Sequence, residues 1–264
     1  WYGQGTESNP FQIATLDELR ALSETAIVGF WAVDVHYELT ANIDATNTSS
    51  WHIGDHDGDP STPNQAMGFS PIGNSTDEFQ GTFNGAKLTI TGLTINRPAS
   101  DYVGMFGYLG ESGSISALGV KGVTVSGDEF VGGLIGFIDE GTITASYASG
   151  SVSGNETVGG LVGVNYQGTI TASYATGSVS GDYSVGALAG YNEGTISASY
   201  ATGTVTGDYY VGGLVGLNYQ ATLTASYATG TVTGEYIVGG LVGYNGGGTI
   251  TVSYWNTETS GQAN

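Results

Sequence analysis

The sequence predicts an all-β fold: a single-chain right-handed parallel β-solenoid (β-helix), with about three strands per 27-residue coil and a short N-terminal capping helix. Near-identical segments recur at a nearly fixed spacing, and short β-type runs within them are separated by Gly, Asn, Asp or Gln. One such unit cannot bury its own apolar side chains, whereas stacked coils can, with each strand paired in parallel with its counterparts above and below. The handedness follows from the crossover rule for parallel strands.

Residues 1–100 are predicted to form an N-terminal cap and irregular early coils of one continuous solenoid. Thr15 and Glu18 have the spacing of a capping box, and apolar residues then follow at helical spacing, which predicts a helix over residues 15–23 that covers the end of the core. Strands are expected over residues 26–35, 37–43 and 86–95. Residues 51–74 are rich in Gly, Pro, Ser and Asp, which predicts a projecting loop.

Residues 101–261 are predicted to form six repeats. Each regular copy contains runs such as VGGLVG, TITASY and SVSG, which have strand composition and no helical period. A divergent copy begins at Asp101. The regular copies begin, at intervals of 27, 27, 26 and 27 residues, at Asp128, Asn155, Asp182, Asp208 and Glu235.

Stacking turns sequence columns into ladders, and three apolar columns are predicted to form the core. Alternation from Ile143 predicts that Ala145 and Tyr147 face inward, so the Tyr column is expected to pack inward or to close a corner. The Asn column is expected at a corner, where each amide can bond the next coil. The apolar columns are Val131, Val158, Val185, Val211 and Val238; Leu134, Leu161, Leu188, Leu214 and Leu241; and Ile143, Ile170, Ile196, Leu223 and Ile250.

The repeats resemble a known motif. GGLVG followed by GTITASYATGSVSG resembles the GLUG motif, a repeat of large bacterial surface proteins that include adhesins and the stalks of immunoglobulin-A-cleaving metallopeptidases. The opening GQGTESNPFQIATLDELRALSE, and later FQGTFNGAKLTITGLTI and VGMFG, resemble the segment that commonly precedes such repeats. The resemblance implies a surface scaffold and not a reaction. The zinc chemistry of the peptidases would need HExxH on a helix, and the chain has no such motif.

Composition excludes several classes of partner. The 264 residues carry a net charge of -20 with only four Lys and Arg, which argues against nucleic acid and anionic membranes because both require a basic surface. No apolar run approaches the roughly 20 residues of a membrane span, so no membrane insertion is expected. The absence of Cys excludes disulfides and thiol nucleophiles.

The segment HIGDHDGDP is the one place where metal-binding residue types are concentrated. Asp55, Asp57 and Asp59 alternate and could converge on Ca²⁺, a hard cation that takes six to eight oxygen ligands. The EF-hand pattern fails, because Pro60 occupies the sixth position and Ala66 the twelfth, where Glu is needed. Ca²⁺ is therefore a candidate cofactor, and the alternative is a solvated acidic turn.

We expect a non-catalytic extracellular or cell-surface module, structural or adhesive, as in an adhesin, stalk or filament subunit. Its expected partners are a cell surface, a glycan or further copies of itself, end to end or side by side; no catalytic residue is assigned. A first alternative is binding of ice or another ordered surface through a grid of T-x-T pairs. A second alternative is a carbohydrate-binding or carbohydrate-active β-helix, although the four basic residues are not clustered and the Asp residues near Asp55 lie in a loop without the motifs of such hydrolases. The grid residues are Thr142, Thr144, Thr169, Thr171, Thr195, Ser197, Thr222, Thr224, Thr249 and Thr251.

Overall fold

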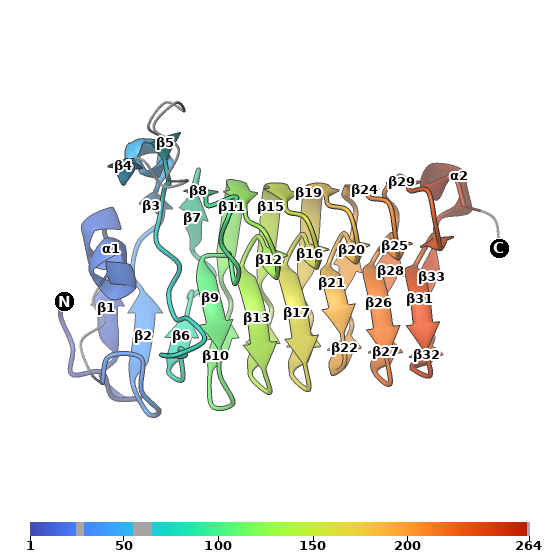
Figure 1. The fold of residues 1–264 in the computed structure, drawn as a ribbon. Coiled ribbons are helices and arrows are strands. Elements are labelled where there is room, and N and C mark those ends of the chain that lie inside the picture. The colour runs from blue at the N-terminus through green and yellow to red at the C-terminus, as the bar shows by residue number, and fades with distance from the viewer. Residues whose placement is uncertain (25–28, 55–64, 263–264) are drawn as a thin grey trace.

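The computed structural model describes residues 1–24, 29–54 and 65–262. Figure 1 shows coils stacked side by side along one axis, with α1 (Leu16–Glu24) at the N-terminal end and α2 (Thr257–Ser260) at the C-terminal end. Strands of successive coils pair in parallel in four sheets, and one short antiparallel pair lies outside them. The predicted parallel β-solenoid with an N-terminal helix is therefore confirmed.

Two of the four sheets run almost the full length of the solenoid. The threonine sheet has nine strands, in the order β1 (Phe11–Ile13), β2 (His36–Leu39), β6 (Thr82–Asn84), β10 (Ser114–Ser116), β14 (Thr142–Thr144), β18 (Thr169–Thr171), β22 (Thr195–Ser197), β27 (Thr222–Thr224) and β32 (Thr249–Thr251). The tyrosine sheet has eleven: β3 (Ile43–Asp44), β7 (Thr89–Thr91), β8 (Thr94–Asn96), β11 (Gly119–Ser126), β15 (Tyr147–Ser153), β19 (Tyr174–Ser180), β23 (Tyr200–Ala201), β24 (Thr204–Thr206), β28 (Tyr227–Ala228), β29 (Val232–Thr233) and β33 (Tyr254–Trp255).

The other two sheets begin later in the chain. The valine sheet consists of β12 (Val131–Gly132), β16 (Val158–Gly159), β20 (Val185–Gly186), β25 (Val211–Gly212) and β30 (Val238–Gly239). The aromatic sheet consists of β9 (Phe106–Leu109), β13 (Ile135–Asp139), β17 (Val162–Tyr166), β21 (Ala189–Asn192), β26 (Val215–Tyr219) and β31 (Val242–Gly246). Each regular coil thus contributes to four sheets, whereas the sequence predicted about three strands per coil.

A tight glycine turn produces the additional strand. The run VGGLIG reads as one strand, but the chain turns after Gly132, and the amides of Leu134 and Ile135 both donate to the carbonyl of Leu161 in the next coil at 3.0 Å. A Cβ on Gly132 would lie 2.0 Å from the carbonyl oxygen of Ile135, so only glycine fits this turn. The turn divides the expected strand between the valine and aromatic sheets.

The predicted apolar columns form the core along most of the solenoid. The first four members of the Val, Leu and Ile columns are fully buried. In the last described coil Leu241 is 5% exposed, whereas Ile250 is 36% exposed. Trp255 packs against the core, and Asn256 caps α2 by accepting bonds from the amides of Glu258 and Thr259.

The N-terminal helix begins with the predicted capping box. The amide of Glu18 donates to Oγ1 of Thr15 at 3.2 Å, and the Glu18 carboxylate accepts from the amides of Ala14 and Thr15 at 2.8 and 3.0 Å. These bonds lower the pKa of Glu18, the amide of Ala14 contributing most. Leu19 and Leu22 on the inner side of α1 are fully buried, so the helix is anchored to the core.

Candidate functional site

The threonine sheet presents the predicted grid of hydroxyl side chains. Strand pairing aligns Thr142, Thr169 and Thr195 in one column and their partners two residues later in a second. Every member of both columns is exposed or half-exposed, while the apolar residue between them faces the core. Several hydroxyls bond to the next coil, as Thr171 does to Ser197 at 3.0 Å. The grid exists as predicted, and its binding of a surface stays a prediction.

The proposed Ca²⁺ ligands Asp55, Asp57 and Asp59 lie outside the described residues. The segment is flanked by β4 (Ile53–Gly54) and β5 (Gln65–Ala66), an antiparallel pair that projects from the solenoid beside the short 3-10 helix η1 (Thr46–Ser50). Within the described part of the chain, no group of three His, Cys, Asp or Glu is placed to hold a metal ion.

His52, at the base of this projection, has a structural role. Its Nε2 lies 2.9 Å from the carboxylate of Glu24 at the end of α1, and its Nδ1 lies 2.6 Å from the carbonyl oxygen of Gly68. The guanidinium of Arg20 sits 4.8 Å from the centre of the Trp51 ring and pairs with Glu24 at 2.8 Å. These contacts attach the projecting segment to the helical cap.

The tyrosine column forms a stacked ladder on the outer side of the tyrosine sheet. Tyr147, Tyr174, Tyr200 and Tyr227 are half-buried, with adjacent ring centres 4.7–5.0 Å apart. The expected inward placement of Ala145 and Tyr147 is wrong: Ala145 is exposed with φ of 50°, a left-handed conformation that shifts the alternation by one residue, so Ala148 and not Tyr147 faces the core.

The residue that takes the inward place is Ser146. It is fully buried, and its hydroxyl accepts from the amide of Leu118 at 3.1 Å while donating to the carbonyl of Thr144 at 2.9 Å. The same arrangement recurs in each later coil, where Ser173, Ser199, Ser226 and Ser253 occupy this position. This serine ladder therefore joins successive coils and has no free reactive hydroxyl.

The asparagine column joins the coils as predicted. Nδ2 of Asn165 donates to Oδ1 of Asn192 at 2.7 Å, and the pattern continues to Asn218 and Asn245 at 2.8 Å for each step. The first three amides are fully buried. Oδ1 of Asn165 has no hydrogen-bond partner among the described residues, because the preceding coil places Ile138 beside it. The ladder is structural and starts where the repeats first carry Asn.

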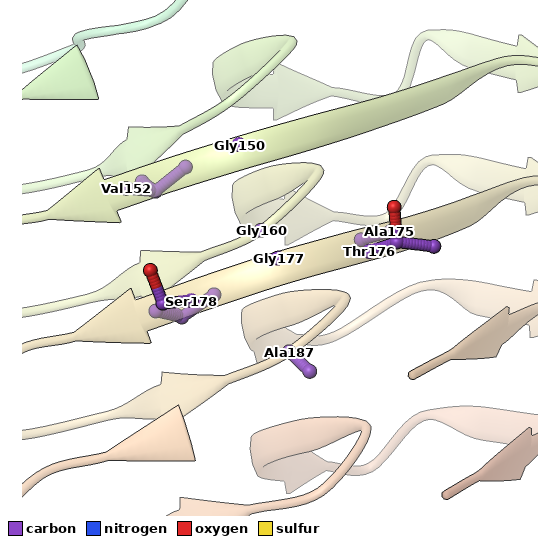
Figure 2. A pocket seen from close by; sticks show the side chains of 9 residues that line it. Gly150, Val152, Gly160, Ala175, Thr176, Gly177, Ser178 and Ala187 are labelled. Atoms are coloured by element: carbon purple, nitrogen blue, oxygen red, sulfur yellow. The ribbon is translucent and has the colours of Figure 1, made fainter. Parts of the chain in front are cut away.

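The pocket shown in Figure 2 offers little space for a ligand. This cavity has a volume of about 10 Å³ and lies between Val152, Ala175, Val179 and Ala187. Such a volume holds about one water molecule. A larger open depression of about 310 Å³ lies at the N-terminal end and is lined by Gln4, Gly5, Phe11, Gly29, Phe30 and Val35.

Rings gather on the outer side of the aromatic sheet, a feature not predicted from the sequence. Tyr108 and Phe137 stack at 4.9 Å, and Tyr102 lies over both and against Phe130 at 5.0 Å. Phe137 also reaches Tyr166 in the next coil at 6.4 Å. These five residues form the first ring cluster. The sequence does show aromatic residues immediately before the valine column, but only in some of the repeats.

A second ring cluster covers the later coils. Tyr209 lies 4.4 Å from Tyr236 and 5.7 Å from Tyr183, while Tyr210 contacts Tyr183 at 5.2 Å and Tyr244 at 5.5 Å. Four of the five are 41–50% exposed, Tyr210 being half-buried. We name the two clusters together the aromatic face.

Carboxylates crowd the start of each repeat beside these rings. The pKa of Glu129 is raised, first by partial desolvation and then by the charges of Glu156, Asp101 and Asp128. The repeats begin with an acidic residue except at Asn155, whose side-chain amide donates to Asp128 at 2.6 Å. Asn at this position therefore replaces repulsion between two carboxylates with a hydrogen bond.

Comparisons with known proteins identify the repeats. Halomucin from Haloquadratum walsbyi is 40% identical over 152 residues, which are 56% of this chain and 2% of that protein. A protein from Evansella cellulosilytica, provisionally named a Gly-rich membrane protein, is 36% identical over 137 residues, which are 51% of this chain and 14% of that protein. The chain thus spans a small fraction of the length of either relative.

A solved structure supports the fold. A protein from Bacteroides ovatus, provisionally named an immunoglobulin A1 protease, superposes with a TM-score of 0.68 at 21% identity, covering 96% of this chain and 77% of the other. The model of the GLUG motif matches residues 154–180, 181–206 and 207–233, which coincide within one residue with three predicted repeats. The chain therefore contains three GLUG repeats, which form successive coils of a β-solenoid.

Proposed function

We propose that the chain is a non-catalytic structural or adhesive module of an extracellular surface protein. The observation that carries this proposal is the use of polar side chains in the repeats. Buried Asn and Ser residues form hydrogen bonds between successive coils. They therefore join the coils into a rigid solenoid and do not converge on a reaction centre.

The names of the relatives support an extracellular location for this chain. One is a halomucin and the other is provisionally named a Gly-rich membrane protein. No helix among the described residues has the length and apolar character needed to cross a bilayer. A module of this kind would act as a spacer or a binding surface within a longer surface protein.

Surface labelling of the source cells tests this function. Antibodies raised against the folded chain should bind intact cells, and a protease added outside the cells should remove that signal. Antibodies against a cytoplasmic enzyme provide the control, since they should bind only after lysis. Detection of the chain only after lysis would overturn the proposal.

A second candidate function is binding of ice or another ordered surface by the threonine sheet. It is favoured by the register of the exposed Thr columns, whose spacing is about 4.8 Å along the solenoid and about 6.6 Å across it. Thermal hysteresis of concentrated protein is the direct measurement. Thr169→Tyr with Thr222→Tyr should abolish it, and an absence of hysteresis in the unmodified chain would remove this candidate.

A further inference from the structure

Four rings of the second ring cluster are left uncovered by the rest of the described chain. The second ring cluster presents Tyr183, Tyr209, Tyr236 and Tyr244 with 45%, 41%, 50% and 45% of their surface open to solvent. Tyr209 and Tyr236 are stacked with an angle of 11° between the rings, so each covers one face of the other, and their edges and remaining faces are left to a partner. Contiguous exposed rings are typical of binding surfaces, because aromatic residues supply much of the contact energy in protein interfaces.

The carboxylates beside these exposed rings indicate the charge of the partner. Asp182, Asp208 and Glu235 each precede one of the exposed tyrosines, and all three are exposed. The backbone bonds from Tyr209 to Asp182 and from Tyr236 to Asp208 hold these positions in adjacent coils. No Lys or Arg follows Lys121 in the sequence, so the repeats carry no cation of their own to neutralise these carboxylates.

Carboxylates also hold rings of the aromatic sheet directly. The hydroxyl of Tyr108 donates to Asp139 at 3.2 Å, and the hydroxyl of Tyr191 donates to Glu193 at 2.6 Å. Ring faces attract Lys and Arg through their quadrupole, and neighbouring carboxylates attract the same groups by charge. Both properties therefore favour the same chemical class of ligand.

We propose that the aromatic face is the docking site for an extended polypeptide segment rich in Lys or Arg. The inference deepens and rests on the proposed function, since it assigns a surface and a partner class to the extracellular module. A second copy of the chain fits poorly, because its own carboxylates would meet those of the first copy. A neutral polysaccharide could stack on the rings but would leave the carboxylates unneutralised.

The dimensions suit a short segment. The aromatic sheet has six strands, and at about 4.8 Å per strand the aromatic face extends roughly 24 Å along the solenoid. An extended chain rises about 3.3 Å per residue, so about eight residues span the aromatic face. A labelled peptide of alternating Arg and Ser of this length is the appropriate probe for the complete chain.

The first experiment measures binding of that peptide by fluorescence anisotropy. We expect saturable binding, and we expect Tyr209→Ser with Tyr236→Ser to weaken it about tenfold. The matched control is Tyr200→Ser with Tyr227→Ser, which removes two rings stacked at 5.0 Å from the tyrosine sheet and should change affinity less than about twofold. Equal losses in the two pairs, with unfolding midpoints unchanged, would overturn the assignment to this face.

The second experiment separates local charge from the net charge of the chain. Asp182→Asn, Asp208→Asn and Glu235→Gln together should lower the dependence of affinity on NaCl concentration. Glu7→Gln, Asp77→Asn and Glu111→Gln make the same change in net charge at exposed positions outside the aromatic face and should leave that dependence unchanged. The same salt dependence in both triple variants would show non-specific attraction and overturn the site.

The last two probes are a neutral polysaccharide and a peptide of alternating Glu and Ser, and neither should bind as the Arg peptide does. Binding of the polysaccharide but not of the Arg peptide, lost on removal of Tyr209 and Tyr236, would overturn the partner class while leaving the extracellular module intact. Failure of surface labelling would instead contradict the proposed function, and the peptide measurement with purified protein remains interpretable in that case.

Discussion

The early coils and the regular repeats build the same solenoid in different ways. Four of the five fully buried rings of the described chain, Tyr37, Phe69, Phe79 and Phe83, come from the first hundred residues, and the fifth, Phe106, follows directly after them. Tyr37 contacts Phe83 at 6.5 Å, and Phe83 contacts Phe106 at 5.5 Å. The five regular repeats instead bury Val, Leu, Ile and Ala together with Asn and Ser. Large rings therefore fill the early coils, whereas identical small side chains fill the later ones.

The path of the chain accounts for this difference. Between β2 and β6 the chain leaves the threonine sheet to form β3, η1 and the β4–β5 pair, so successive coils have different lengths and surroundings. A hydrogen-bonded side-chain ladder requires the same residue at the same place in adjacent coils, which only the repeats provide. Irregular coils therefore depend on ring packing, and regular coils can depend on buried polar bonds as well.

The largest effect is expected from removing a ring in the early coils. Phe83→Ala should lower the free energy of unfolding by about 3–5 kcal/mol, because the fully buried ring leaves a cavity between Tyr37 and Phe106. Ile196→Val in the repeats, also fully buried, should cost about 1 kcal/mol. Urea unfolding measures both. A smaller loss for Phe83→Ala than for Ile196→Val would contradict the dependence of the early coils on large rings.

The asparagine ladder should give the next largest effect. Asn192→Ala removes the acceptor of Asn165 and the donor to Oδ1 of Asn218, both buried, and should cost about 3 kcal/mol. Asn245→Ala is the matched control: Asn245 is exposed in the last described coil and makes one ladder bond, as acceptor of Asn218, so its loss should cost about half as much. Hydrogen exchange of the amides in coils 155–234 locates the change. Equal costs at the two positions would show that the buried bonds contribute nothing.

These contrasts also show what the sequence could establish. The Val, Leu and Ile columns and the Thr15 capping box followed from spacing alone, and the structure confirms both. The inward position of Ser146 could not be foreseen, because the left-handed conformation of Ala145 is not marked by Gly or Asn. A single non-Gly residue with positive φ therefore changes which side chains are buried.

The candidate sites were predicted less completely than the fold. The Thr grid follows from register, which the repeats fix. The aromatic face does not, because it combines positions that are aromatic in some repeats only, such as Phe130 and Tyr210, whose places are taken by Thr157 and Ser184 in the copies between them. The Ca²⁺ site at Asp55, Asp57 and Asp59 stays a prediction.

The serine ladder should contribute less per residue than the asparagine ladder. Ser199→Ala removes the acceptor for the amide of Ser173 at 3.2 Å and should cost about 2 kcal/mol, because this buried N–H is left unpaired. Thr222→Ala on the exposed side of the neighbouring strand should stay within about 0.5 kcal/mol. Thermal unfolding of both variants checks the order, and a neutral Ser199→Ala would indicate that the amide finds another partner.

The smallest effect is expected at the helical cap, where it depends on pH. Glu18→Ala should cost about 1 kcal/mol at neutral pH, because the amides of Ala14 and Thr15 lose their acceptor. Hydrogen bonds lower the pKa of Glu18 in the folded chain, so this carboxylate adds stability above its unfolded pKa, about 4.3. That stability is lost as the pH falls through the lower, folded-state pKa.

Glu18→Gln keeps an oxygen at this position but cannot titrate. The difference in free energy of unfolding between the unmodified chain and Glu18→Gln should therefore be constant near neutral pH and should shrink as the pH falls below about 4.3. Asp77→Asn is the control, because this carboxylate is exposed away from the cap. Hydrogen exchange should place the Glu18 effect in α1 and leave the repeats unchanged. A difference independent of pH would show that the ionised carboxylate gives the cap no stability beyond that of an amide, whereas a change spread through the repeats would mean that the cap and the repeats unfold as one unit.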